Sequence, residues 1–220
     1  MADDTEHTPP ASKLTQTKQR WAREGRFLTG RIARPADQRL PPGQHLTKDW
    51  PVLDLGITPK ITRERWKLDV HGAVETPLFW DFADFTAQPQ SDFISDIHCV
   101  TTWSRYDNAW QGLSTRSLLD ACHPKSDARF VALHAHDGYT TNLTLEDFAA
   151  DDALLAHSWQ GTPISSEHGG PVRLIVPHLY FWKSAKWLQR IEFLAADHPG
   201  YWEERGYHNR GDPWAEQRYS

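Results

Sequence analysis

A cysteine at the end of an apolar run is the first candidate for chemistry. Cys99 follows the segment 93–98, whose pattern is typical of a strand, and it precedes a hydroxyl-rich stretch. A sulfur placed where a strand meets a turn can point into a cleft. As a thiolate it is both a nucleophile and a soft metal ligand. The neighbouring His98 and Arg105 could hold it deprotonated, although a lone cysteine is more often packed in a core. The sequence around it leaves both interpretations open.

A glycine-containing loop is the second candidate. His168 is followed by two glycines and a proline, and Arg173 then lies in the apolar stretch 172–176. Glycines let backbone N–H groups approach a ligand closely. The planar fork of an arginine suits a phosphate group. A glycine pair is also common in ordinary loops, so this pattern alone is a weak indication of a site.

A third candidate, the segment 183–188, carries two lysines, Lys183 and Lys186, with Ser184 and Ala185 between them. Cations and a hydroxyl group on a turn of small residues suit a phosphate or a polar heterocycle. The alternative is a solvated basic turn between aromatic core residues. Taken in chain order, the three segments fit an anionic, phosphate-bearing cofactor whose metal takes one sulfur from the protein.

The elements that position these candidates are predicted from apolar periodicity and capping residues. Thr144 is expected to cap a short helix, and a loop is expected at 107–110. Strands are expected at 66–72, 93–100, 129–135, 139–143, 153–159, 172–176 and 187–195, and short helices at 80–85 and 114–121. Many short strands with short helices between them indicate an α+β fold with mixed β-sheets.

The composition, 39% hydrophobic and 24% charged residues in a chain of 220, is that of a globular protein. A net charge of −5 does not favour a nucleic-acid partner, and no segment reaches the ~20 apolar residues of a membrane span. Two cysteines are too few for a disulfide framework, and the first 20 residues lack the apolar run of a signal peptide. We therefore expect a cytoplasmic protein with a mobile segment at 1–25 and a single domain at 26–220.

The three candidate segments together resemble the oxidoreductase molybdopterin-binding domain of the sulfite oxidase family. The likeness is greatest to the bacterial branch that includes the catalytic subunit of the protein-methionine-sulfoxide reductase. Segment 98–104 is similar to the stretch around the molybdenum-ligating cysteine, and segment 168–173 to a loop that contacts the pterin and its phosphate. Segment 183–188 is similar to the following loop, which holds the cofactor. The resemblance covers roughly residues 30–215 and implies the mixed-sheet fold of that domain.

The resemblance also implies a molybdenum–molybdopterin cofactor and a role for each matched residue. Cys99 would be the metal ligand and a catalytic residue, and Arg105 is assigned to the substrate side. The implied cofactor-binding residues are Cys99, His168, Arg173, Ser184, Ala185 and Lys186, with Lys183 as a looser match. The expected reaction is a two-electron oxygen-atom transfer to or from a small molecule. A separate electron-transfer protein is expected because the chain shows no heme or iron–sulfur cysteine pattern.

The substrate itself is not implied. Only Arg105 lies where the sulfite-oxidising relatives carry an arginine-rich stretch after the cysteine. Two other functions stay open. One is a cysteine hydrolase or transferase with Cys99 as nucleophile and His168 as base, in which the lysine-rich loop has no role. The other is a non-catalytic pterin-binding module.

Overall fold

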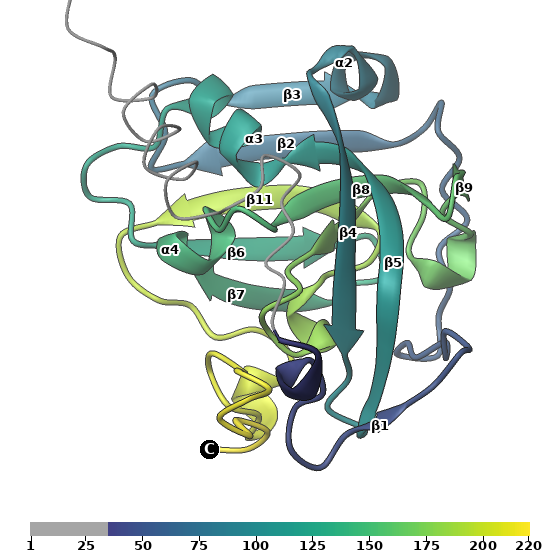
Figure 1. Cartoon of the computed structure of the whole chain (residues 1–220). Helices are drawn as coiled ribbons and strands as arrows, with labels where there is room; N and C mark the ends of the chain where they lie inside the picture. Colours follow the sequence, from purple (N-terminus) through teal and green to yellow (C-terminus); the bar gives the residue numbers. More distant parts are fainter. Residues whose placement is uncertain (1–34) are drawn as a thin grey trace, which may run out of the picture.

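The structure, a computed structural model, describes residues 35–220 (Figure 1). The predicted mobile segment, residues 1–25, lies outside the described residues, as does residue 26, where the predicted domain begins. The described part of the chain forms two β-sheets joined by short helices.

The five-stranded sheet has parallel and antiparallel pairs. Strand β11 lies at its centre, parallel to β2 and antiparallel to β6, while β3 and β7 pair antiparallel at the two edges. Its strands, in spatial order, are β3 (Leu78–Asp81), β2 (Lys67–Gly72), β11 (Leu188–Leu194), β6 (Phe130–Ala135) and β7 (Thr140–Thr144).

The six-stranded sheet is organised around one long strand, β5. This strand pairs with β1 in parallel and with β4 and β8 antiparallel. In Figure 1, β4 and β5 run across the direction of the other sheet. The strands are β1 (His45–Leu46), β4 (Gln90–His98), β5 (Trp103–Ser114), β8 (Leu154–Trp159), β9 (Thr162–Pro163) and β10 (Arg173–Ile175). The expected α+β fold with mixed sheets is therefore confirmed.

The three α-helices within residues 35–220 are short, and each begins at a side-chain cap. Asp81, Ser114 and Thr144 each accept a hydrogen bond from a backbone N–H of the first helical turn. These helices are α2 (Phe82–Ala87), α3 (Thr115–Cys122) and α4 (Leu145–Phe148), and the 3-10 turns are η1 (Ala36–Gln38), η2 (Ser166–His168), η3 (Phe181–Lys183) and η4 (Glu203–Arg205). Within residues 35–220, no helix has the length and apolar character needed to cross a membrane.

The first half of β8, in the six-stranded sheet, is buried on both faces. Successive residues of β8 alternate between two apolar clusters: Leu155 belongs to the larger one, shared with the five-stranded sheet, and Leu154 and Ala156 to the smaller one. A strand segment buried on both sides has no polar face, which explains the apolar run 154–156. The smaller cluster also contains Cys99. The scaffold thus places this cysteine at a buried position.

The expected loop at 107–110 is wrong, because these residues lie inside β5. The structure compensates the polar side chain of Asn108 with tertiary partners. Its amide donates to the backbone oxygen of Ser95 at 3.1 Å, and its side-chain oxygen accepts from Trp159 Nε1 at 3.1 Å. Polar residues that are satisfied across a sheet look like loop residues when only local sequence is considered. The helix expected at 80–85 likewise begins two residues later, after β3.

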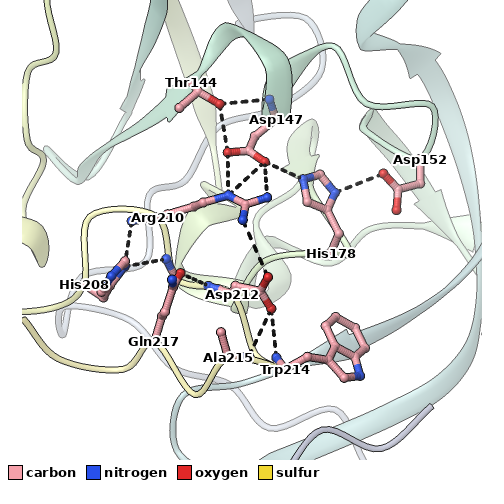
Figure 2. A network of polar contacts seen from close by, with 11 residues as sticks. Thr144, Asp147, Asp152, His178, His208, Arg210, Asp212, Trp214, Ala215 and Gln217 are labelled. Atoms are coloured by element: carbon pink, nitrogen blue, oxygen red, sulfur yellow. Dashed lines mark hydrogen bonds and ion pairs between the residues drawn. The ribbon is translucent and has the colours of Figure 1, made fainter. Parts of the chain in front are cut away.

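A charged network fixes the C-terminal segment to the scaffold (Figure 2). The carboxylate of Asp147 on α4 accepts from Arg210 and lies 3.2 Å from His178 Nε2, while His178 Nδ1 lies 3.1 Å from Asp152. Burial disfavours the charged imidazolium, but the two carboxylates outweigh it and raise the pKa of His178 to about 9. Arg210 also pairs with Asp212 at 3.6 Å. Negatively and positively charged side chains therefore alternate along this network, from buried Asp152 to the more exposed Asp212.

Candidate active site

A tight hairpin between β4 and β5 positions Cys99. The Cys99 N–H donates to Trp103 O at 2.8 Å, and Thr102 N–H donates to Cys99 O at 3.0 Å. The three residues between Cys99 and Trp103 form a tight turn whose last residue needs a positive φ. Thr102 takes that position with φ 78°. A β-branched residue is strained there. The hairpin therefore holds the sulfur at a strand end at some cost in backbone energy.

The thiol of Cys99 is almost sealed, since the residue is 5% exposed. Its sulfur lies 3.1 Å from the hydroxyl oxygen of Thr101. Burial raises the pKa of the thiol, and the nearby positive charge of Arg218 opposes that rise. Arg218, from the C-terminal segment, donates to Val100 O at 2.5 Å. Without a further cation or metal, the sulfur is held as a thiol at neutral pH.

One cavity of about 300 Å³ brings most of the predicted residues together. Cys99, His168, Arg173, Ser184 and Lys186 all line it, although they come from segments far apart in the sequence. The thiol and two cationic side chains therefore open onto a shared space. This is the arrangement that an anionic ligand with a metal at one end requires.

Arg173 is a buried cation that lacks a counter-ion among the described residues. It is 2% exposed and donates to the carbonyl oxygens of His168 and Ser184, both at 2.7 Å. Its guanidinium also lies 4.3 Å from the ring centroid of Phe181. Burial lowers its pKa to about 9 because no carboxylate compensates the charge. A buried guanidinium held only by carbonyl groups is poised to receive an anion.

Lys186 is the second cation of the cavity, and within the described chain it too forms no ion pair. Burial, reinforced by repulsion from Arg173, lowers its pKa to about 8. Its ammonium donates to Glu167 O at 2.7 Å. Gly169 lies against it: a Cβ at this glycine would meet Lys186 Cβ at 2.7 Å. Glycine is required there both for this close approach and for its φ of +100°.

The imidazole of His168 is oriented by Ser165 and Trp50, and not by Cys99. Its Nδ1 lies 2.9 Å from Ser165 Oγ and its Nε2 lies 3.0 Å from Trp50 O, and its ring stacks on Trp50 at 4.0 Å between centroids. Burial lowers its pKa, which favours the neutral ring. With both nitrogens engaged elsewhere, this imidazole is not arranged as a base for Cys99. The geometry therefore gives no support to the cysteine hydrolase.

Three of the predicted residues do not line the cavity. Ala185 is buried and its carbonyl accepts from Leu174 N–H at 2.9 Å. Arg105 donates to Lys48 O and to Asn108, and its guanidinium lies 4.7 Å from the Trp159 ring centroid. Lys183 is fully buried and pairs with Glu203 at 2.6 Å. These side chains have partners in the protein scaffold.

Several lining residues were not apparent from the sequence. Trp50 lies in the proline-rich stretch before the regular pattern begins, and Tyr207 lies near the C-terminal end; neither was assigned a role in the site from the sequence. Burial raises the pKa of Tyr207, and the negative charges that Tyr219 and Cys99 carry when ionised raise it further. The high tryptophan content was the available signal, since five tryptophans line the cavity: Trp50, Trp103, Trp182, Trp187 and Trp202.

The donor set fits a planar anionic group. The indole N–H of Trp103 is buried without a hydrogen-bond partner, although it lines the cavity. A buried donor without a partner is costly unless a ligand or water satisfies it. Unpaired cations, an unsatisfied N–H and aromatic walls suit a heterocycle that carries a phosphate. Cys99 supplies the single soft ligand that a metal on such a group would need.

Fold and site together are those of an oxidoreductase domain that binds an organic cofactor, and comparison with known sequences gives the family. The profile of the family described as "Oxidoreductase molybdopterin binding domain" matches residues 55–202. The chain belongs to this molybdopterin-binding oxidoreductase family.

Relatives with similar sequences agree with this assignment. The chain is 48% identical over 190 residues to the uncharacterized oxidoreductase YuiH of Bacillus subtilis, covering 85% of this chain and 96% of that protein. It is 28% identical over 172 residues to the protein-methionine-sulfoxide reductase catalytic subunit MsrP of Campylobacter jejuni, covering 68% of this chain and 56% of that one.

The crystal structure of the sulfane dehydrogenase SoxCD from Paracoccus pantotrophus superposes with a TM-score of 0.61 at 18% identity. It covers 71% of this chain and 46% of that chain. At this identity the similarity shows the fold. The chain thus spans only about half the length of the reductase subunit and of the SoxCD chain.

Proposed function

We propose that this protein is a molybdenum–molybdopterin-dependent oxidoreductase in which Cys99 ligates the metal. The observation that carries the proposal is that the Cys99 thiol shares one cavity with Arg173 and Lys186, two cations without a carboxylate partner in the described chain. A non-catalytic pterin-binding module would need the cations and the aromatic walls, but it would need no sulfur at their far end.

When bound, the cofactor supplies a metal that exchanges an oxygen atom and two electrons with a substrate. The chain itself binds and orients it. Arg173 and Lys186 would hold the phosphate, and His168 and Ser184, which line the same cavity, would contact the pterin. Trp103 would donate its free indole N–H. The buried position of Cys99 would keep bulk water away from the sulfur–metal bond.

The surroundings of the cysteine favour a neutral substrate. Val100, Thr101, Trp103 and Phe181 lie along the cavity with Cys99, and none carries a charge. Arg105, expected to face the substrate, is held by Lys48, Asn108 and Trp159 instead. Among the residues that line the cavity, an oxyanion such as sulfite would meet no lysine or arginine beyond Arg173 and Lys186, which are assigned to the cofactor. We infer a neutral oxo-compound, and a sulfoxide agrees with the activity named for the methionine-sulfoxide reductase relatives.

Electrons would come from a separate protein, because the described residues contain no cluster of histidine, cysteine and carboxylate ligands for a second metal. Both cysteines, Cys99 and Cys122, are unpaired, and this agrees with a reducing compartment. We therefore infer a cytoplasmic protein, which fractionation of cells that express the full-length gene would test.

The experiment is a substrate comparison with protein made in cells that synthesise the cofactor. Molybdenum is quantified first, and then reduction of dimethyl sulfoxide is followed by the oxidation of a reduced viologen dye. Near-stoichiometric molybdenum and turnover of the sulfoxide, with little oxidation of sulfite, support the proposal. Protein that lacks molybdenum and pterin, or holoenzyme that turns over sulfite alone, would overturn the function or the substrate class respectively.

A further inference from the structure

The closest buried ion pair of the described chain is not among the groups that line the cavity. Lys183 Nζ lies 2.6 Å from Glu203 Oε1, and the two side chains are 0% and 2% exposed. Removing two charges from water costs more free energy than a well-packed apolar pair would. Burial accordingly lowers the pKa of Lys183, although Glu203 opposes this. Such a pair contributes little to the stability of the fold. Its position therefore suggests another role.

Lys183 has no hydrogen left for a ligand. An ammonium carries three N–H donors. One faces Glu203, and the other two are donated to the backbone oxygen and the side-chain oxygen of Asn142, both at 2.9 Å. Lys183 could contact a cofactor only by breaking one of these buried bonds. Its effect on the site must therefore pass through Glu203 and Asn142.

Glu203 collects donors from the same region. Its Oε1 accepts from Trp182 Nε1 and from Thr141 Oγ1, both at 2.9 Å, in addition to Lys183. Its Oε2 is buried without a partner. All three donors lie on β7 or on η3 and thus belong to the scaffold, whereas Glu203 belongs to the C-terminal segment. One carboxylate oxygen therefore fixes that segment to the scaffold.

The two residues are adjacent in sequence to two different segments that line the cavity. Lys183 ends η3 and immediately precedes Ser184, whose carbonyl holds Arg173 and whose hydroxyl accepts from Val176 N–H at 2.9 Å. Glu203 begins η4, directly after Trp202 and four residues before Tyr207, both of which line the cavity. A displacement of the pair would move one wall relative to the other.

We propose that the buried Lys183–Glu203 pair is a positioning device that sets the distance between the cofactor loop, residues 183–187, and the aromatic wall formed by Trp202 and Tyr207. Lys183 is then a positioning residue and not a cofactor ligand. That one wall meets cofactor and the other substrate rests on the proposed function. The placement of the walls does not, and it can be measured without cofactor.

The test compares Lys183→Met/Glu203→Gln with Glu204→Gln. The double variant removes both charges and leaves no buried charge unpaired. The control makes the same change in the next residue, whose side chain is 61% exposed. The first readout uses metal-free protein and follows hydrogen exchange of the Arg205, Gly206 and Tyr207 amides, which bond to Trp202 and Glu203 carbonyls.

We expect these three amides of the double variant to exchange about tenfold faster than in the control, while the melting temperature matches the control. In molybdenum-loaded protein, KM for the sulfoxide should rise about tenfold with kcat and metal content little changed, because the wall that meets substrate is displaced. Exchange equal to the control would overturn the proposal, whatever the activity. If the double variant does not fold, Glu203→Gln alone is measured, and unchanged exchange there overturns it equally. If the wild-type protein contained no molybdenum, the proposed function would be wrong. The hydrogen-exchange result would still test whether the Lys183–Glu203 pair positions the two segments.

Discussion

The guanidinium of Arg173 donates to the carbonyl oxygen of Ser184 at 2.7 Å, deep in the protein, without a carboxylate partner in the described chain. This contact joins the candidate segment 168–173 to the candidate segment 183–188. It also leaves a full positive charge at the cavity wall. Most of the site's expected behaviour follows from this uncompensated charge and from the sulfur at the other end.

Replacing Arg173 with Gln should abolish cofactor retention. We expect molybdenum content to fall more than tenfold, and stability to fall by about 1–3 kcal/mol because buried carbonyls lose their donors. Arg129→Gln is the matched control, since Arg129 also donates only to carbonyl oxygens, those of Ser126 and Ala128, but is exposed. Metal analysis and urea unfolding of both variants measure the effects. Equal molybdenum in the two would remove Arg173 from the cofactor site.

The charged network around His178 predicts a loss of stability at alkaline pH (Figure 2). Burial lowers the pKa of His178, but Asp147 and Asp152 outweigh it and raise the pKa to about 9, above the unfolded value of ~6.5. The contribution of His178 to stability is complete below pH ~6.5 and is lost as pH rises to about 9. Since one unit of pKa shift corresponds to about 1.36 kcal/mol, this contribution amounts to at most about 3 kcal/mol.

The measurement is urea unfolding of wild type and His178→Gln at pH 6 and pH 9.5. The difference in unfolding free energy between the two proteins should be large at pH 6 and small at pH 9.5. A difference that does not change with pH would mean that His178 is not charged in the folded protein. Burial opposes ionisation of Asp147, but His178, Arg210 and Thr144 hold its pKa low, so a second loss of stability should come only in strong acid.

Gly169→Ala should disturb Lys186 more than its backbone conformation alone explains. Both Gly169 and Gly138 have positive φ, at 100° and 86°, so alanine is strained at either position. Only at Gly169 would the added Cβ meet another residue, Lys186 Cβ at 2.7 Å, whereas Gly138 has nothing within 4 Å. Melting temperature and molybdenum content of the two variants separate the effects. The prediction fails if Gly138→Ala loses as much cofactor.

Thr102→Gly should stabilise the protein by about 1 kcal/mol, because it relieves the positive φ of the hairpin that carries Cys99. Thr101→Gly serves as the comparison: Thr101 has no such φ and should become less stable on gaining backbone freedom. Thermal unfolding of both variants gives the two signs. A loss of stability in Thr102→Gly would show that the hairpin is not strained.

The elements that the sequence predicted correctly are those determined by interactions between residues close together in the chain. The strand that delivers Cys99 and the caps Ser114 and Thr144 were recognised because alternation and capping depend on neighbouring residues. The sequence could not separate Lys183 from Lys186. The two are chemically identical and three residues apart, and only the arrival of Glu203 from a later segment makes one an internal partner and leaves the other at the cavity.

The position of the Arg105 side chain was not predictable from the sequence for a related reason. Proximity in sequence to Cys99 suggested a substrate contact, but strand alternation and the acceptors Lys48 O and Asn108 draw its side chain away from the cavity. Trp50 was missed because its role depends on a tertiary contact with His168, which no local pattern encodes.

The most direct test of the central claim is the molybdenum content and visible absorption of Cys99→Ser, with Cys122→Ser as the matched control. Both cysteines are buried, but only Cys99 lines the cavity. We expect the control to keep its molybdenum and its thiolate-to-metal absorption, and Cys99→Ser to lose that absorption together with turnover. If Cys99→Ser kept the same absorption as Cys122→Ser, the metal would not be bound through the sulfur of Cys99, and the claim would be contradicted.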